Sequence, residues 1–108
     1  MSYLSEIVID ALHPASLARF WEEVLDAFEV RAYDDDEIAR LAQLGLTPET
    51  DPGVALDGPQ LTIFFQLCSP TKGARNRIHL DVVCASESAE IARLCQLGAS
   101  VRERCEGY

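Results

Sequence analysis

The sequence predicts an α+β fold in which two strand–helix units face one another. Residues 76–83 alternate with a period of two, as a strand with one apolar face does. One face holds Ile78, Leu80 and Val82, and the other holds His79, Asp81 and Val83. Residues 6–10 alternate in the same way, with Glu6 and Asp10 on the polar face. Because a helical pattern follows each of these stretches, we expect two units of the same kind.

Composition limits the possible partners. The 108 residues fit one domain, 1–108, and 48% hydrophobic with 25% charged residues is ordinary for a globular protein. A net charge of −9 argues against nucleic acid or an anionic membrane as a partner, since both attract basic surfaces. No apolar run approaches the roughly 20 residues of a membrane span, and the N-terminus lacks the basic start of a signal peptide. The four cysteines lack metal-site spacing, so we expect reduced thiols and a cytoplasmic location.

The elements of the first half follow from periodicity and punctuation. Pro14 stands at the first position of a helix whose apolar stripe is expected to face the core. That stripe comprises Leu17, Phe20, Trp21, Val24, Leu25 and Phe28. A short strand is predicted at 28–32. The run Asp34-Asp35-Asp36 is read as the N-terminus of a helix over 37–44, ended by Gly45, in preference to a cation site.

The second half alternates strands and loops. Strands are predicted at 54–56 and 60–68 around the turn Asp57-Gly58-Pro59, followed by a polar loop at 69–76. Ser86 is the expected N-cap of a helix that reaches Leu97 and ends at Gly98. A further strand is expected to begin within 99–102.

Two internal matches compete for the repeat. Residues 37–45 and 90–98 agree at eight of nine positions, but no strand with an acidic end precedes the first copy, so we interpret them as two similar amphipathic helices. The weaker match has the right order of elements. It aligns Glu6 with His79 at the start of each strand, an offset of 73 residues.

With these motifs in place, the chain resembles the glyoxalase/bleomycin-resistance/dioxygenase (vicinal oxygen chelate) superfamily, and within it the glyoxalase-like domain group. The resemblance rests on the first strand, Leu17-Ala18-Arg19-Phe20-Trp21, Phe64-Phe65-Gln66, the K-x-x-x-N-R-I-H-L-D-V pattern of 72–82 and the R-L-x-x-L-G-A pattern of 93–99. It implies two βαβββ modules that form a curled mixed sheet around a cup, with helices on the outer face. Module one would cover about 1–70 and module two about 76–108. The second module looks incomplete at the C-terminus, so we expect a homodimer in which a neighbouring subunit supplies a strand.

The resemblance also suggests where a site would lie. In the metalloenzymes of the superfamily the cup holds a divalent metal, and the positions that carry over are Glu6, Gln66 and His79, an N/O set suited to Zn, Ni, Fe or Mn. A metal-dependent lyase, isomerase or dioxygenase is one hypothesis. A second is a metal-free binding module for a small organic molecule, whose cup would be lined by His79, Asp81, Gln66, Phe64, Asp10 and Val8, and whose acidic lining favours a neutral or cationic ligand. A third is a catalytically silent dimeric domain.

Overall fold

The computed structural model describes residues 1–68 and 77–102. The elements follow in the order β1 (Tyr3–Ala11), α1 (Pro14–Val24), β2 (Glu29–Val30), α2 (Asp35–Gln43), β3 (Gly53–Asp57), β4 (Thr62–Leu67), β5 (Ile78–Val83) and α3 (Glu87–Gln96). The loop predicted at 69–76 lies outside the described residues. Residues 99–102 are not a strand, which corrects the prediction made for them.

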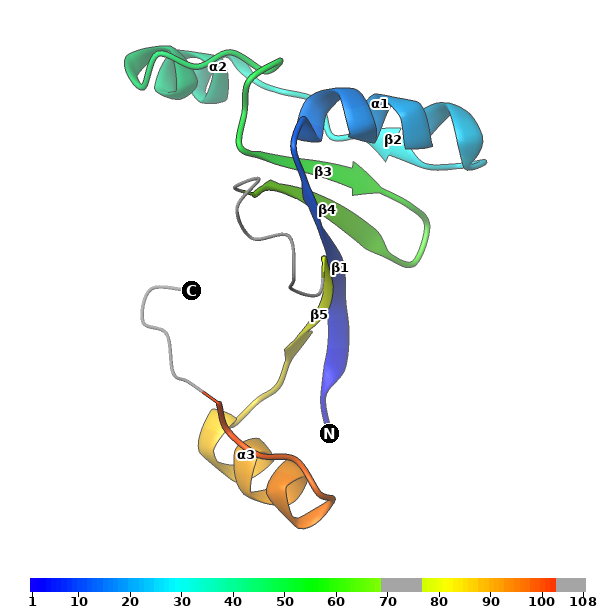
Figure 1. Cartoon of the computed structure of the whole chain (residues 1–108), viewed down its shortest axis with the longest axis vertical. Helices are drawn as coiled ribbons and strands as arrows, with labels where there is room; N and C mark the ends of the chain where they lie inside the picture. The colour runs from blue at the N-terminus through cyan, green and yellow to red at the C-terminus, as the bar shows by residue number, and fades with distance from the viewer. Residues whose placement is uncertain (69–76, 103–108) are drawn as a thin grey trace.

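A single mixed sheet joins the strands in the order β2-β3-β4-β1-β5. β1 runs parallel to β4, whereas β2 with β3, β3 with β4, and β1 with β5 are antiparallel. The first four strands and α1 thus form one βαβββ unit, with α2 inserted between β2 and β3 (Figure 1). The α+β fold with a mixed sheet is therefore confirmed.

The two strands that the repeat aligns, β1 and β5, pair with each other in the antiparallel direction. Ile7 lies opposite Leu80, which is also its partner in the alignment, because 80 − 7 = 73. On either side of this pair, Glu6 lies opposite Asp81 and Val8 lies opposite His79. In the alignment, by contrast, Glu6 matches His79 and Val8 matches Asp81, because 79 − 6 and 81 − 8 are both 73. The antiparallel pairing is therefore symmetric about Ile7 and Leu80, and the two-module organisation stays a prediction.

The core lies between α1 and the middle of the sheet. Ala15 and Ala18 of α1 pack with Val54, Leu56 and Phe65, and all five are at most 4% exposed. The two alanines have no bulk to hold the helix away from β3 and β4. The helix starts as predicted, with Pro14 in its first turn.

The predicted stripe of α1 was too wide. Phe20 is 56% exposed and Val24 is 52% exposed, whereas Leu17, Trp21, Leu25 and Phe28 pack against the core. Phe20 instead meets Trp21 edge to face, with ring centroids 5.3 Å apart. Expecting Phe20 in the core was wrong. The face of α1 that carries the small residues Ala15 and Ala18 packs on the sheet, and Phe20 lies on another face of the helix.

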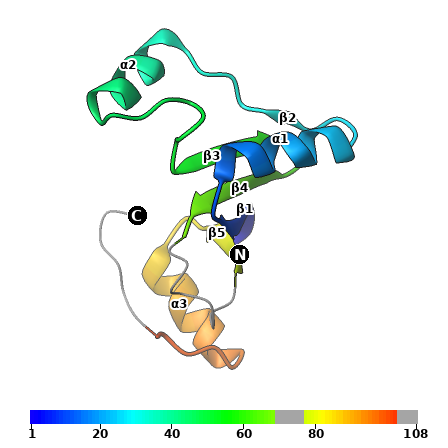
Figure 2. The same cartoon turned by 45° about the horizontal axis from the view of Figure 1, so that its top comes forward.

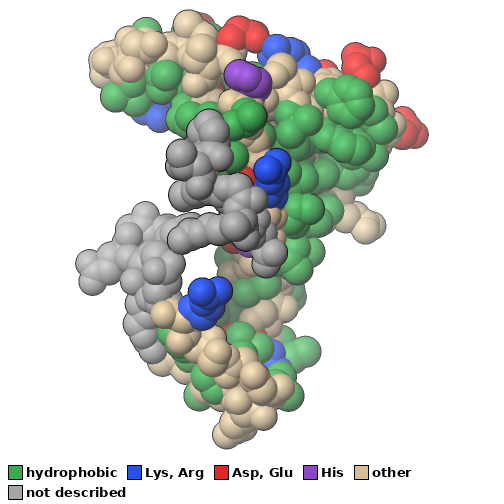
Figure 3. Space-filling view, in the orientation of Figure 1, with side chains coloured by type: hydrophobic (Ala, Val, Ile, Leu, Met, Phe, Trp, Pro, Cys, Tyr) green, Lys and Arg blue, Asp and Glu red, His purple; other side chains and the backbone are tan. Residues whose placement is uncertain are grey.

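β5 also differs from expectation, because its apolar face is not covered. Ile78, Leu80 and Val82 are more than half exposed. Within the described part of the chain, α3 packs closely on none of the strands, and it lies beyond the end of β5 (Figures 1 and 2). Hydrophobic side chains are accordingly visible at the surface from α1 down along the strands (Figure 3).

The helix ends match the sequence signals. Asp34 caps α2 in a capping box with Glu37, Ser86 caps α3, and Gly45 and Gly98 take positive φ values of 74° and 113° after the helices. The acidic run at 34–36 therefore serves the start of α2. Among the described residues, none of the helices has the length and apolar character needed to cross a membrane.

Candidate functional site

The strand register brings the six residues predicted to line the cup onto one face. Ile9 and Phe65 point toward α1, so the residues that alternate with them point the other way, and we call that side of the sheet the cup face. Three rows cross β4, β1 and β5 on this face: Thr62–Glu6–Asp81, Phe64–Val8–His79 and Gln66–Asp10. All six residues predicted to line the cup are therefore neighbours on adjacent strands.

The middle row is the apolar centre of this face. Val8 is 2% exposed and lies between Phe64 on one side and His79 on the other. Ala55 of β3 extends the row beyond Phe64. An aromatic ring, two aliphatic side chains and an imidazole thus form a continuous strip across four strands.

Polar pairs flank the strip. His79 Nδ1 lies 3.1 Å from Asp81 Oδ1, a contact that orients the imidazole, and both side chains remain accessible at 40% and 33%. The Gln66 amide donates to Asp10 Oδ1 at 3.4 Å, which is long for such a bond. Glu6, Asp10 and Asp81 make this face acidic around a single imidazole.

The predicted metal set is spread along the strands. Glu6 lies beside Thr62, whereas Gln66 lies beside Asp10, so the two are four residues apart on adjacent strands. At about 3.3 Å per residue and about 4.8 Å between strands, their Cα atoms are separated by roughly 14 Å. Both side chains would have to lie flat on the sheet to reach one ion. Within the described segments no three His, Cys, Asp or Glu side chains form a metal-binding group. The residues do not fit a single ion as placed, and the metal set stays a prediction.

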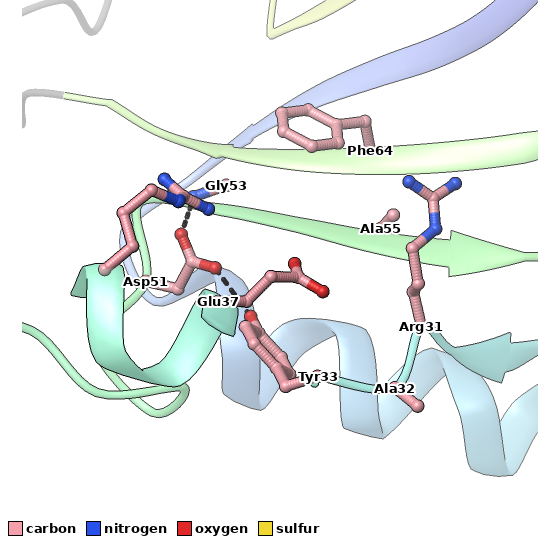
Figure 4. Close-up of a pocket in the computed structure, with 9 residues that line it drawn as sticks. Arg31, Ala32, Tyr33, Glu37, Asp51, Gly53, Ala55 and Phe64 are labelled. Carbon is pink, nitrogen blue, oxygen red and sulfur yellow. Dashed lines mark hydrogen bonds between the residues drawn. The ribbon is translucent and has the colours of Figure 1, made fainter. Parts of the chain in front are cut away.

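A cavity that the sequence did not reveal opens beside the cup. It has a volume of about 300 Å³ and lies between the cup face of β3 and β4 and the segment that leads from β2 into α2 (Figure 4). Phe64 belongs to both the cup and the cavity. The other residues that matter there are Arg31, Tyr33, Glu37, Arg40, Asp51 and Gly53. Arg31 follows β2 and pairs through its backbone with Ala55, a register that only the folded sheet defines.

Asp51 joins two segments at the base of the cavity through hydrogen bonds. Its Oδ2 accepts a hydrogen bond from the Tyr33 hydroxyl at 2.6 Å, and its Oδ1 accepts one from the Gly53 backbone N–H at 3.0 Å. Burial, and then the hydrogen bond to Asp51, raises the pKa of Tyr33, so the phenol stays protonated. The segment after β2 is thereby tied to the start of β3.

Arg31 is fixed by a bidentate pair with Asp57. Its Nε and Nη2 donate to the two carboxylate oxygens at 2.8 and 2.7 Å. These hydrogen bonds raise the pKa of Arg31 and lower the pKa of Asp57. The charges of Glu6 and Glu37 also raise the pKa of Arg31, by less than Asp57 does.

Gly53 allows Phe64 to lie against β3. A Cβ atom at position 53 would come within 2.5 Å of Cζ of the Phe64 ring. Because real carbon contacts are about 3.5–4.0 Å, the ring can hold this position only above a glycine. The shared wall of cup and cavity therefore depends on Gly53.

A family model described as "Glyoxalase-like domain" matches residues 6–108, nearly the whole chain. No curated protein and no solved structure matched the chain.

Proposed function

The chain belongs to the glyoxalase-like domain family of the vicinal oxygen chelate superfamily, and from this premise we propose that its cup face binds a small organic molecule. The observation that carries the proposal is the strip Phe64–Val8–His79, an apolar floor that ends in an imidazole. Binding sites for small molecules combine such apolar surfaces with a few polar groups that fix orientation. Here His79, Asp81, Gln66 and Asp10 are those groups.

The charge of the cup selects the ligand class. Glu6, Asp10 and Asp81 surround His79, so an anionic ligand would meet three carboxylates and a neutral or cationic one would not be repelled. A planar or aliphatic part would lie against Phe64, since Val8 beside it is already buried. A polar part would reach the imidazole.

The test is a thermal-shift screen of a library of small molecules, followed by titration of the hits against variants. A ligand that binds only the folded protein raises the melting temperature further as its concentration increases. Phe64→Ala should abolish the shift. Phe20→Ala, which removes an equally large ring from the exposed side of α1, is the matched control and should retain it. Equal shifts in the two variants would refute the cup as the binding site.

Metal-dependent lyase, isomerase or dioxygenase activity is the alternative carried by the family resemblance, with Zn, Ni, Fe or Mn as the ion. The separation of Glu6 from Gln66 speaks against one ion held by both, so no catalytic step is derived through a metal. The check is a titration of each metal salt into the protein, followed by calorimetry. Tight metal binding that is lost in both Glu6→Gln and His79→Ala would favour the metal-dependent alternative over the metal-free binding site.

We also propose a cytoplasmic homodimer. In the described part of the chain β5 pairs on one side only, and its Ile78, Leu80 and Val82 are exposed. Both features favour association of two copies. The described cysteines Cys68, Cys84 and Cys95 are free thiols, as expected for a reducing compartment. Light scattering coupled to size exclusion should give twice the chain mass, and Leu80→Lys should halve it; a monomeric native protein would refute the dimer. A dimer that binds none of the screened molecules would leave the catalytically silent dimeric domain as the better reading.

A further inference from the structure

The cavity beside the cup carries opposite charges on different walls. Arg31 enters it from the end of β2 and Glu37 enters it from the first turn of α2, and both side chains reach toward the space next to Phe64 (Figure 4). Glu37 raises the pKa of Arg31 through its charge, yet no salt bridge within 4.0 Å joins the two among the described residues. The two charges therefore line the same cavity without being paired with each other.

Both charged groups keep unused hydrogen-bonding capacity. Arg31 donates the Nε hydrogen and one Nη2 hydrogen to Asp57. The two Nη1 hydrogens and the second Nη2 hydrogen remain as donors for a ligand. Among the described residues, the Glu37 carboxylate accepts one hydrogen bond, from the Asp34 backbone at 3.4 Å. A carboxylate with its remaining lone pairs open and a guanidinium with a free edge line the same space.

This pattern discriminates against ions of either sign alone. A cation near Glu37 would also meet Arg31 and the nearby Arg40, and an anion near Arg31 would also meet Glu37 and Asp51. A group with both charges satisfies both walls. Hydrogen bonds to ionised partners are the strongest that proteins make, so a ligand that matches both ends gains from each of them.

We propose that the cavity binds the dipolar head of a ligand of the α-amino-acid class, with its carboxylate on the free edge of Arg31 and its ammonium on Glu37. The apolar remainder of the ligand lies over Phe64, the residue that the cavity shares with the cup. The geometry requires little reorganisation, because Asp57 fixes Arg31 and the Tyr33–Asp51–Gly53 bonds fix the base. This inference rests on the proposed function and names the ligand class for it.

The test uses three probes that share one side chain and differ in the head group: L-phenylalanine, its N-acetyl derivative, which is an anion, and its methyl ester, which is a cation. Binding to the full chain is followed by calorimetry and by NMR shifts. The free amino acid should bind at least about tenfold more tightly than either derivative, the value of one hydrogen bond to a charged group.

Two variants then separate the ends of the head group. Glu37→Gln keeps a residue that the capping box of α2 accepts, and it should remove the preference over the N-acetyl derivative. Arg31→Gln should remove the preference over the methyl ester. Arg19→Gln, which breaks an exposed ion pair with Glu49 at 2.8 Å, is the matched control and should leave both preferences unchanged.

The outcomes distinguish this inference from the function on which it rests. Equal affinity for the three probes, or no binding of any of them, would overturn the dipolar site. If library hits still bound and still depended on Phe64, the proposed function would survive that result. Preferences that persisted in both Glu37→Gln and Arg31→Gln would likewise overturn the assignment of the two walls.

Discussion

Substituting Gly53 by alanine tests how the wall between cup and cavity is built. The added Cβ would lie 2.5 Å from Cζ of Phe64, so the tip of the ring must move by about 1 Å or more to reach an ordinary contact distance of about 3.5–4.0 Å. Overpacking of this kind costs about 1–3 kcal/mol. Because the clashing atom is the end of a side chain that can swing away, we expect a cost of about 1–2 kcal/mol.

The same substitution should behave differently once the ring is gone. In a Phe64→Ala background the Cβ meets no ring, and since Gly53 does not have a positive φ, the alanine is expected to stabilise by about 0.4–1 kcal/mol through the unfolded chain. The two substitutions should therefore be coupled by about 1.5–3 kcal/mol. Urea denaturation of the native protein, the two single variants and the double variant measures this coupling.

A control cycle removes a ring elsewhere. Gly53→Ala combined with Phe20→Ala should be additive within about 0.5 kcal/mol, because Phe20 is exposed on α1 and shares no partner with Gly53. Additivity in the Phe64 cycle as well would refute the close packing of the ring on Gly53. It would also remove the structural reason for treating cup and cavity as one connected surface.

Three further results are expected. Phe65→Ala should lower the free energy of unfolding by about 3–5 kcal/mol, because Phe65 is fully buried against α1, whereas Phe20→Ala should cost less than about 1.5 kcal/mol; similar costs in urea denaturation would contradict the assigned core. Asp34→Ala should destabilise by about 0.5–2 kcal/mol through loss of the cap of α2, and Asp34→Asn should recover most of this, also measured by urea denaturation. Hydrogen bonds from Arg93 and then Ser2 lower the pKa of Glu90 to about 2, so its contribution to stability is complete above the unfolded value near 4.3 and is lost as the pH falls toward 2. The stability difference between the native protein and Glu90→Gln should therefore shrink over that interval, and a difference independent of pH from 7 to 2 would contradict the pairing.

Much of the fold could be predicted from the sequence because its signals are local. The alternation in 76–83, the acidic start of α2 and the glycines that end α2 and α3 act within a few residues of where they stand. The repeat offset of 73 residues aligned Glu6 with His79, whereas in the sheet Glu6 lies opposite Asp81 and Val8 lies opposite His79. The same alternation correctly placed Val8, Phe64 and His79 on the face away from α1.

The remaining features depend on which strands become neighbours. Phe20 and Ile78 look like core residues in the sequence, but a side chain is buried only when another element covers it, and α1 turns the first away from the core while α3 leaves the second uncovered. The cavity has the same origin. Arg31, Glu37 and Gly53 lie in three segments with no shared motif, and the register of β2, β3 and β4 brings them together around Phe64. The sequence by itself determined the elements and their faces through short-range periodicity, whereas only the tertiary structure decided which charges meet across a cavity, because that depends on strand register rather than on sequence spacing.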